Sequence, residues 1–150
     1  MMNTLFQIEI TKADDKFRQS IVSLLQAEKL PVKDLPSPLD NFFVAVEDNN
    51  VIGVIGLEQY DKCGLLRSMV VNIQYRNKNI ASRLVNKLEE KAGSLGIESI
   101  YLLTETATAY FEKKGYEKIG RTEVPKSIQA STEFSSVCPD SAIVMKKAIA

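Results

Sequence analysis

The chain has 150 residues, 45% of them hydrophobic and 25% charged, and its 19 Lys and Arg residues balance its 19 Asp and Glu residues. This zero net charge argues against a general affinity for nucleic acid or an anionic membrane, because both require a basic excess. The length and composition are typical of a globular domain, so residues 1–150 are expected to form a single domain.

The sequence shows neither a targeting signal nor a metal-ligand pattern. Its N-terminus lacks the charged start and apolar run of a secretory signal, and no apolar stretch is long enough to cross a bilayer, so a cytoplasmic location is expected. The absence of His excludes His-based triads and His general bases. Cys63 and Cys138 are far apart and lack neighbouring ligands, so both are expected to be free thiols and no metal site is expected.

The first quarter of the chain shows both periodicities of regular structure. Apolar residues alternate with polar ones over residues 5–10, which predicts a half-buried strand. Residues 14–30 carry an apolar stripe at helical spacing, which predicts a helix. Three prolines then predict a loop over residues 31–38.

Strands and helices continue to alternate along the rest of the chain. The predicted elements are strands over 42–47, 51–60 and 65–72, a helix over 80–92, a strand over 98–104, a helix near 107–114, and strands over 116–121 and 143–147. Glycines are expected to close both helices, Gly93 and Gly96 the first and Gly115 the second. Antiparallel strands that feed a strand–helix–strand crossover predict an α/β (α+β) fold, with a mixed, mostly antiparallel central sheet flanked by helices.

The turn between strand 65–72 and helix 80–92 is the most informative segment. The start of a helix offers backbone N–H groups without intrahelical partners and the positive end of the helix dipole. A strand that leads into such a start builds an anion site suited to phosphate, and Arg76 and Lys78 add positive charge there. The alternative is a polar turn with solvated basic residues.

At this turn the sequence resembles the GNAT acetyltransferase family. The family motif has Arg or Gln, two variable residues, Gly, one variable residue, then Gly or Ala, and Arg76, Asn79 and Ala81 occupy those positions. Strand 65–72 resembles the family strand whose backbone binds the pantetheine arm, and residues 109–116 resemble the family's late helix with its Gly-aromatic end. The resemblance covers roughly residues 5–121.

This resemblance implies the acyl-CoA N-acyltransferase fold, acetyl-CoA as co-substrate and direct transfer of the acetyl group to a small amine. It also implies a homodimer, because family members commonly pair through late strands, and no partnership with nucleic acid or membrane. The cofactor-binding residues that it implies are Met69, Val70, Val71, Arg76, Asn77, Lys78, Asn79, Ile80, Ala81, Ser82 and Phe111.

Two departures from the family pattern change what is expected. Asn77 and Asn79 stand where the family has glycines beside the pyrophosphate. Because Asn tolerates left-handed backbone angles better than most residues, the turn is expected to survive, with weaker cofactor binding. Phe111 aligns with the family's general-acid Tyr and has no proton to give. Tyr110 is adjacent, but neighbours on a helix point about 100° apart, so water or another group is expected to protonate the departing thiolate.

The catalytic base is expected to be a carboxylate or a water, because the chain has no His. Glu58 on strand 51–60 is the first candidate, since the family often places a Glu near this part of the sheet, and Glu105 after strand 98–104 is the second. For either residue the alternative is an ordinary surface carboxylate. Arg67 lies inside an apolar strand and is a candidate to bind a substrate carboxylate; its alternative is a side chain on the solvent face.

The C-terminal third points toward the acceptor. Residues 100–116 resemble the acetyltransferase domain of N-acetylglutamate synthases, and with the segments 124–128, 132–142 and 145–147 they resemble amino-acid acetyltransferase-like proteins of arsenic-resistance gene clusters. This resemblance implies an amino-acid-like acceptor with a free amine and an acid group. The candidate substrate contacts are Arg67, Arg121, Lys126 and Ser141. The alternative is that the tail only completes the sheet.

Two other functions stay open at this stage. The acceptor could be an arylamine, a polyamine or an antibiotic amine, although zero net charge favours an acidic acceptor over a polycation. The protein could also bind acetyl-CoA as a sensor or partner module with little catalysis, which the substitutions at Asn77, Asn79 and Phe111 favour.

Overall fold

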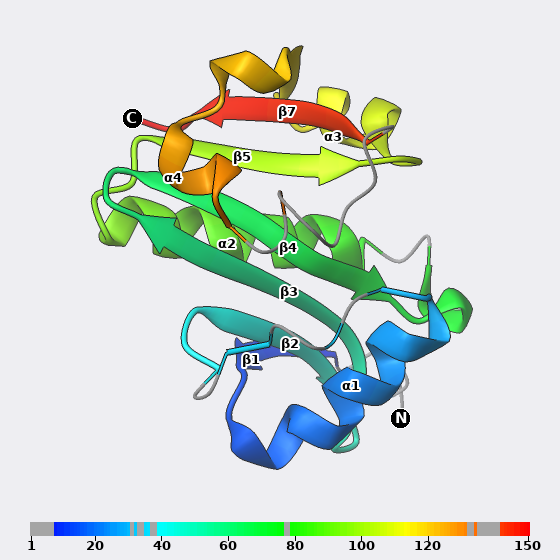
Figure 1. Cartoon of the computed structure of the whole chain (residues 1–150). Helices are drawn as coiled ribbons and strands as arrows, with labels where there is room; N and C mark the ends of the chain where they lie inside the picture. The colour runs from blue at the N-terminus through cyan, green and yellow to red at the C-terminus, as the bar shows by residue number, and fades with distance from the viewer. Residues whose placement is uncertain are drawn as a thin grey trace. The chain divides into compact units, whose positions relative to one another are not determined.

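A computed structural model gives the fold (Figure 1), and it describes residues 8–30, 32, 35–36, 39–76, 79–131, 134 and 142–150. The strands are β1 (Glu9–Lys12), β2 (Phe42–Glu47), β3 (Asn50–Tyr60), β4 (Cys63–Val71), β5 (Ser99–Thr104), β6 (Glu117–Ile119) and β7 (Ile143–Ala148). The helices are α1 (Arg18–Ala27), α2 (Ile80–Ser94), α3 (Thr108–Lys113) and α4 (Lys126–Gln129), and 3-10 turns lie at η2 (Asp15–Phe17), η3 (Ile73–Tyr75) and η4 (Arg121–Glu123).

Within the described residues, hydrogen bonds join seven strands in the order β1-β2-β3-β4-β5-β7-β6. The pairs β1·β2, β2·β3, β5·β7 and β6·β7 are antiparallel, whereas β4·β5 is parallel. The predicted mixed, mostly antiparallel sheet with helices is therefore confirmed. No helix in the described part of the chain has both the length and the apolar character to cross a membrane.

The chain divides into two compact units, each built from separate segments of sequence. The first comprises residues 1–56 and 68–91, and the second comprises residues 57–67 and 92–150. Strands β3 and β4 supply residues to both units, so each unit is described separately below.

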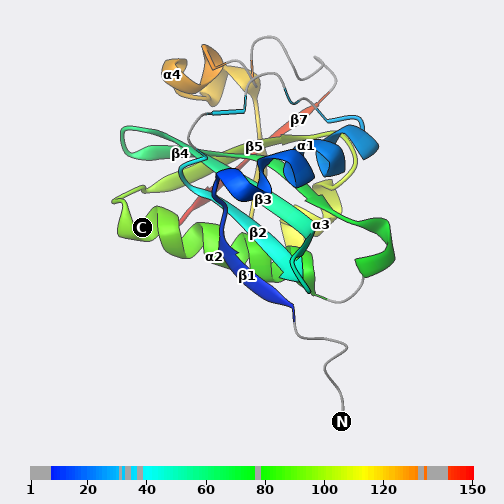
Figure 2. The same ribbon diagram turned by 90° about the horizontal axis from the view of Figure 1, so that it is seen from below.

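In the first unit, the strands have a helix on each side (Figure 2). One face carries the core in which α1 packs on the strands, with Ile21, Leu24 and Leu25 contacting residues such as Phe42 and Val44. The opposite face meets α2, because a Cβ atom placed on Gly53 would lie 3.2 Å from Leu84 Cδ1. The hairpin between β2 and β3 turns at Asp48 and Asn49, both at positive φ (50° and 67°), which is the type I′ geometry that matches strand twist.

In the second unit, α4 packs over the paired strands, and Figure 1 shows it in orange beside β5. Its buried Ile128 joins a core with Leu65, Tyr101 and Val144, one residue from each of β4, β5 and β7. Val124 and partly buried residues, among them Tyr60 and Phe134, complete this core. The segment that follows β6 therefore covers one face of these strands.

The predicted glycine stops are largely confirmed. Helix α2 ends at Ser94, and Gly96 follows at φ +78° with the N–H of Ile97 bonded to Ala92 O at 3.0 Å. The same arrangement ends α3 at Gly115, φ +96°. In both places the left-handed backbone needs glycine because a side chain would be strained. Gly93, in contrast, lies inside α2 and does not close it.

Several element boundaries differ from the sequence predictions. The described part of the first strand covers Glu9–Lys12 and so continues past residue 10, because pairing with β2 extends to Lys12 opposite Phe43. Residues 5–7 lie outside the described residues. The strand predicted to begin at residue 65 already begins at Cys63, after a turn in which Asp61 has φ +58°.

Candidate active site

The predicted cofactor segment begins where β4 ends, in the first unit. Asn72 caps η3 by accepting a hydrogen bond from the N–H of Gln74 at 2.9 Å, and its own N–H donates to Ile52 O at 2.7 Å. Tyr75 then donates its hydroxyl to Glu47 at 2.6 Å, and this hydrogen bond raises the pKa of the Tyr75 phenol. The chain is thus attached to both β2 and β3 before it reaches the helix.

Asn79 makes the turn that opens α2. Its φ is +61°, the left-handed conformation that the sequence predicted for a family glycine position. Its carbonyl accepts the first helical hydrogen bond, from the N–H of Arg83 at 3.0 Å. The 15-residue helix that follows has no acidic residue in its first turn. The backbone N–H groups at Ile80, Ala81 and Ser82 precede the helix's own hydrogen-bond ladder, which suits them to an anion.

Arg76 lies at the same turn but is held by protein partners. Its Nη2 atom donates to Glu28 Oε1 at 2.9 Å, and its Nε atom donates to Val71 O at 3.2 Å. Both side chains of the pair are partly exposed, 46% for Arg76 and 35% for Glu28. The guanidinium is therefore accessible to water. Asn77 and Lys78 lie outside the described residues.

Strand β4 changes its backbone conformation in front of the predicted pantetheine segment. Ser68 has φ +57°, which interrupts the extended backbone inside the strand. A left-handed residue within a strand locally changes the direction of the backbone. The following Val70 and Val71 are buried, at 6% and 8% exposure, and Met69 is partly buried.

A charged cluster of three side chains lies in the second unit. Arg67 donates from Nη1 to Glu58 Oε2 at 2.8 Å, and Tyr60 donates its hydroxyl to Glu58 Oε1 at 2.7 Å. The side chain of Arg67 is 0% exposed, whereas that of Glu58 is 25% exposed. The carboxylate therefore has a fixed donor on each oxygen and still reaches solvent. Arg67 does not lie on the solvent face, which was the alternative for this residue.

The phenol of Tyr60 is held neutral by its surroundings. Burial, and then the hydrogen bond to the Glu58 carboxylate, raise the pKa of Tyr60 to about 12, while a hydrogen bond with Ser131 acts in the opposite direction. Ser131 is itself buried, at 6% exposure, and its hydroxyl donates to Ile128 O at 2.6 Å. The α4 segment therefore reaches the cluster through Ser131.

The remaining predicted site residues lie in varied surroundings in the second unit. Glu105 is exposed just after β5. Phe111 is 5% exposed and packs edge-on against the rings of both Tyr110 and Tyr116, at centroid distances of 5.2 and 5.4 Å. The structure thus gives Phe111 a packing role in an aromatic cluster.

Three predicted substrate contacts follow β6. Arg121 donates from Nη2 to Ala142 O at 3.2 Å and stacks over the ring of Phe134 at 5.1 Å. Lys126 is exposed at the first residue of α4. Ser141 lies outside the described residues, as does Cys138. Cys63 is a free thiol whose pKa is raised chiefly by burial.

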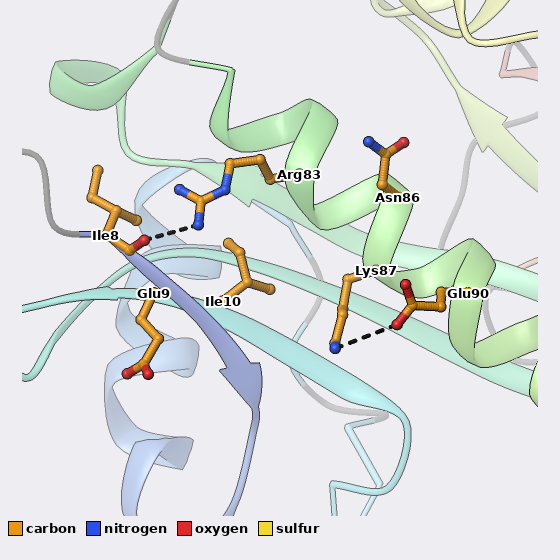
Figure 3. Close-up of a pocket in the computed structure, with 7 residues that line it drawn as sticks. All are labelled: Ile8, Glu9, Ile10, Arg83, Asn86, Lys87 and Glu90. Atoms are coloured by element: carbon orange, nitrogen blue, oxygen red, sulfur yellow. Dashed lines mark hydrogen bonds and ion pairs between the residues drawn. The ribbon is translucent and has the colours of Figure 1, made fainter.

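A hollow of about 700 Å³ lies between β1 and α2 in the first unit and contains none of the predicted site residues. Figure 3 shows Arg83 turned toward Ile8 O, 2.9 Å away, and Lys87 beside Glu90 at 3.6 Å. The hollow is lined by two cationic side chains, Arg83 and Lys87, and by two carboxylates, Glu9 and Glu90. Its charge therefore favours neither anions nor cations.

Sequence reasoning missed Tyr60, Ser131 and Glu28. Tyr60 had a usable signal, because residues two apart on a strand share a face and Glu58 was already a candidate. Ser131 and Glu28 carried no such signal, since Glu28 meets Arg76 across a separation of 48 residues.

Comparisons with known proteins agree with this arrangement. Residues 8–116 match the family model described as the acetyltransferase (GNAT) family. The chain is 31% identical to an uncharacterized N-acetyltransferase of Chlorobaculum tepidum over 67% of this chain and 64% of that protein. It is 28% identical to an amino-acid acetyltransferase of Photorhabdus laumondii over 62% of this chain, but only 21% of that longer protein.

The fold is also similar to a solved structure. N-acetylglutamate synthase from Neisseria gonorrhoeae, complexed with coenzyme A and N-acetyl-glutamate, superimposes with a TM-score of 0.81 and 17% identity. The match covers 95% of this chain and 35% of that one. The chain thus spans 21% of the P. laumondii protein and 35% of the N. gonorrhoeae protein.

Proposed function

The chain belongs to the GNAT acetyltransferase family, and from this premise we propose that it transfers the acetyl group of acetyl-CoA to the amine of a small amino-acid-like acceptor. The observation that carries the proposal is the left-handed turn at Asn79, which follows β4 and opens α2 at the position of the family motif. We propose that residues 1–150 act as one acetyltransferase domain, cytoplasmic and homodimeric.

Acetyl-CoA would bind along the segment from Met69 to Ser82. The pyrophosphate would accept hydrogen bonds from the N–H groups at the start of α2, because these groups lie outside the helical ladder and the dipole favours negative charge. Arg76 would add a guanidinium by releasing or sharing Glu28. The left-handed backbone at Ser68 locally interrupts the extended conformation of β4, which supports contact between the pantetheine arm and the backbone of this strand.

The reaction needs a neutral amine and a base. The amine nitrogen attacks the thioester carbonyl, a C–N bond forms, the C–S bond breaks, and one amine proton leaves. We propose Glu58 as the base that takes this proton, because its carboxylate is held by two donors and remains 25% exposed. Glu105 is the second candidate. Phe111 cannot supply a proton to the departing thiolate, which would take it from water.

An amino-acid-like acceptor is supported by relatives rather than by a contact in this chain. One relative with 28% identity is an amino-acid acetyltransferase, and a structural neighbour was crystallised with N-acetyl-glutamate. Arg121 and Lys126 would supply cations for an acid group on the acceptor, and Ser141 would supply a hydroxyl. Arylamines, polyamines and antibiotic amines are the competing acceptor classes.

Release of the coenzyme A thiol, measured against a panel of acceptors, tests the proposal. We expect turnover with acidic amino acids and little with a polyamine or an arylamine, and saturable binding of acetyl-CoA by calorimetry. Absence of acetyl-CoA binding at millimolar ligand would overturn the cofactor assignment. Tight binding with no turnover on any amine would instead favour a sensor module, for which the replacement of the family Tyr by Phe111 already argues.

A further inference from the structure

We propose that Tyr60 and Arg67 are positioning residues for the reaction, and that they act by holding the Glu58 carboxylate in one orientation. The inference rests on the proposed function, since it assigns a role to two side chains that meet the proposed base. Each donates to a different oxygen of Glu58, at 2.7 Å from Tyr60 and 2.8 Å from Arg67. Two donors on two oxygens restrict rotation of the carboxylate, which a single contact would not do.

Arg67 and Glu58 have different roles because they differ in exposure to solvent. Arg67 has 0% of its side chain exposed and Glu58 has 25%, so only the carboxylate reaches solvent from this pair. A ligand in solvent would therefore meet Glu58 and not the Arg67 guanidinium. Arg67 then acts on a substrate through Glu58, and the acid group of an acceptor must be recognised elsewhere.

The contacts of Glu58 leave part of its carboxylate available to the amine. Each carboxylate oxygen offers two acceptor sites. One site on each oxygen is used by Tyr60 or Arg67, which leaves acceptor capacity for the amine proton.

The acidity of Tyr60 fits a positioning role and not that of the missing general acid. Its phenol stays protonated until the pH approaches its pKa of about 12, so it remains a donor to Glu58 throughout the neutral range. An ordinary thiol has a pKa of about 8.5, well below that of Tyr60. Transfer of a proton from this phenol to the thiolate would therefore be unfavourable. Ser131, which donates its hydroxyl to Ile128 O at 2.6 Å, also forms a hydrogen bond with the Tyr60 phenol from the segment after α4.

Steady-state kinetics of a matched set of variants tests the proposal. Tyr60→Phe removes one donor, Arg67→Met removes the other, and Arg67→Lys restores a positive donor without the guanidinium geometry. Tyr101→Phe is the matched control, because Tyr101 is 5% exposed in the same core and loses the same hydroxyl. Thermal melts establish the temperature at which every variant is folded, and the kinetics are measured below it.

We expect Tyr60→Phe to lower kcat by about tenfold or more, a part of what a general base contributes, with the KM for acetyl-CoA within about twofold of wild type. The loss should fall on kcat and not on the KM for acetyl-CoA, because the base loses its fixed orientation while the segment from Met69 to Ser82 is unchanged. Arg67→Lys should recover part of the activity that Arg67→Met loses, and Tyr101→Phe should match wild type.

The outcomes distinguish this proposal from the function on which it rests. If Glu58→Gln is inactive while Tyr60→Phe keeps the wild-type kcat, the positioning role is wrong and the base assignment stands. A lower kcat that Tyr101→Phe shares, or an equally large rise in the KM for acetyl-CoA, would show a structural role and would also overturn the proposal. If Glu58→Gln keeps full activity, or the wild type acetylates no acceptor, the proposed function itself fails.

Discussion

The guanidinium of Arg67 and the carboxylate of Glu58 lie 2.8 Å apart, yet they differ sharply in their access to water. The side chain of Arg67 is 0% exposed and that of Glu58 is 25% exposed. Removing one partner of a buried ion pair takes a counter-charge from the other partner, at a cost of about 3–5 kcal/mol. The cost should therefore depend on which partner remains, because water can solvate Glu58 but not Arg67.

Glu58→Ala is accordingly expected to lower the free energy of unfolding more than Arg67→Met. The first variant leaves a fully buried guanidinium and should lose about 3 kcal/mol or more. The second leaves a carboxylate that can be hydrated, and the Met side chain fills most of the space of the Arg stem. Urea unfolding at neutral pH measures both. Glu98→Ala, which breaks the exposed Lys62–Glu98 pair, is the control and should change stability by less than about 1 kcal/mol. Equal losses from the two main variants would contradict the expectation.

Tyr60 should titrate later than an ordinary tyrosine and should affect stability at alkaline pH. Its pKa is raised to about 12, chiefly by burial and then by Glu58, whereas the phenol titrates near 10 in the unfolded chain. Because the folded pKa is the higher one, the stabilisation is complete below about pH 10 and is lost as the pH rises toward about 12.

The phenolate absorbance of wild type, followed against Tyr60→Phe, measures this titration. The difference between the two curves should have its midpoint near pH 12, and Glu58→Gln should move that midpoint down because it removes the negative charge. A midpoint near 10 would mean that Tyr60 is neither buried nor bonded to the carboxylate in solution.

The substitutions of Asn79 by alanine and by glycine are expected to act in opposite directions, on both stability and cofactor binding. Its φ of +61° strains most side chains, so Asn79→Ala should cost about 1 kcal/mol and weaken acetyl-CoA binding. Asn79→Gly should relieve the strain and tighten binding, as measured by calorimetry. Asn49→Gly relieves a comparable left-handed turn at φ +67° away from the cofactor segment, so it should leave the Kd unchanged. Tighter binding in both glycine variants would point to a general stability effect.

The pair between Arg76 and Glu28 predicts a reciprocal effect on cofactor affinity. Glu28→Gln removes the carboxylate that holds Arg76 at 2.9 Å and should lower the Kd for acetyl-CoA. Arg76→Gln should raise the Kd severalfold and reduce its dependence on salt, because a charge on the phosphates is lost. Both side chains are at least a third exposed, so each change should alter stability by less than about 1 kcal/mol. An unchanged Kd in both variants would remove Arg76 from the cofactor site.

Much of the fold could be predicted from the sequence because local periodicity reports it. The strand at residues 42–47, the start of α2 at Ile80 and the glycine stops after α2 and α3 depend on residues that are neighbours in the chain. The boundaries that failed depend on partners elsewhere. The first strand continues to Lys12 because β2 supplies hydrogen bonds as far as Phe43, and no local pattern contains that information.

The turn at Asn79 follows from neighbouring residues alone. The motif around Arg76 places a residue that tolerates positive φ at position 79, and the backbone there has φ +61°. The surroundings of the charged side chains, in contrast, depend on how distant segments pack. Whether Arg67 faced solvent or the interior depended on strand register, since a shift of one residue turns every side chain to the other face. Glu58 meets Arg67 from strand β3, Ser131 meets Tyr60 from the segment after α4, and Glu28 meets Arg76 from the end of α1. Side chains that meet across such separations leave no periodic signal in the sequence.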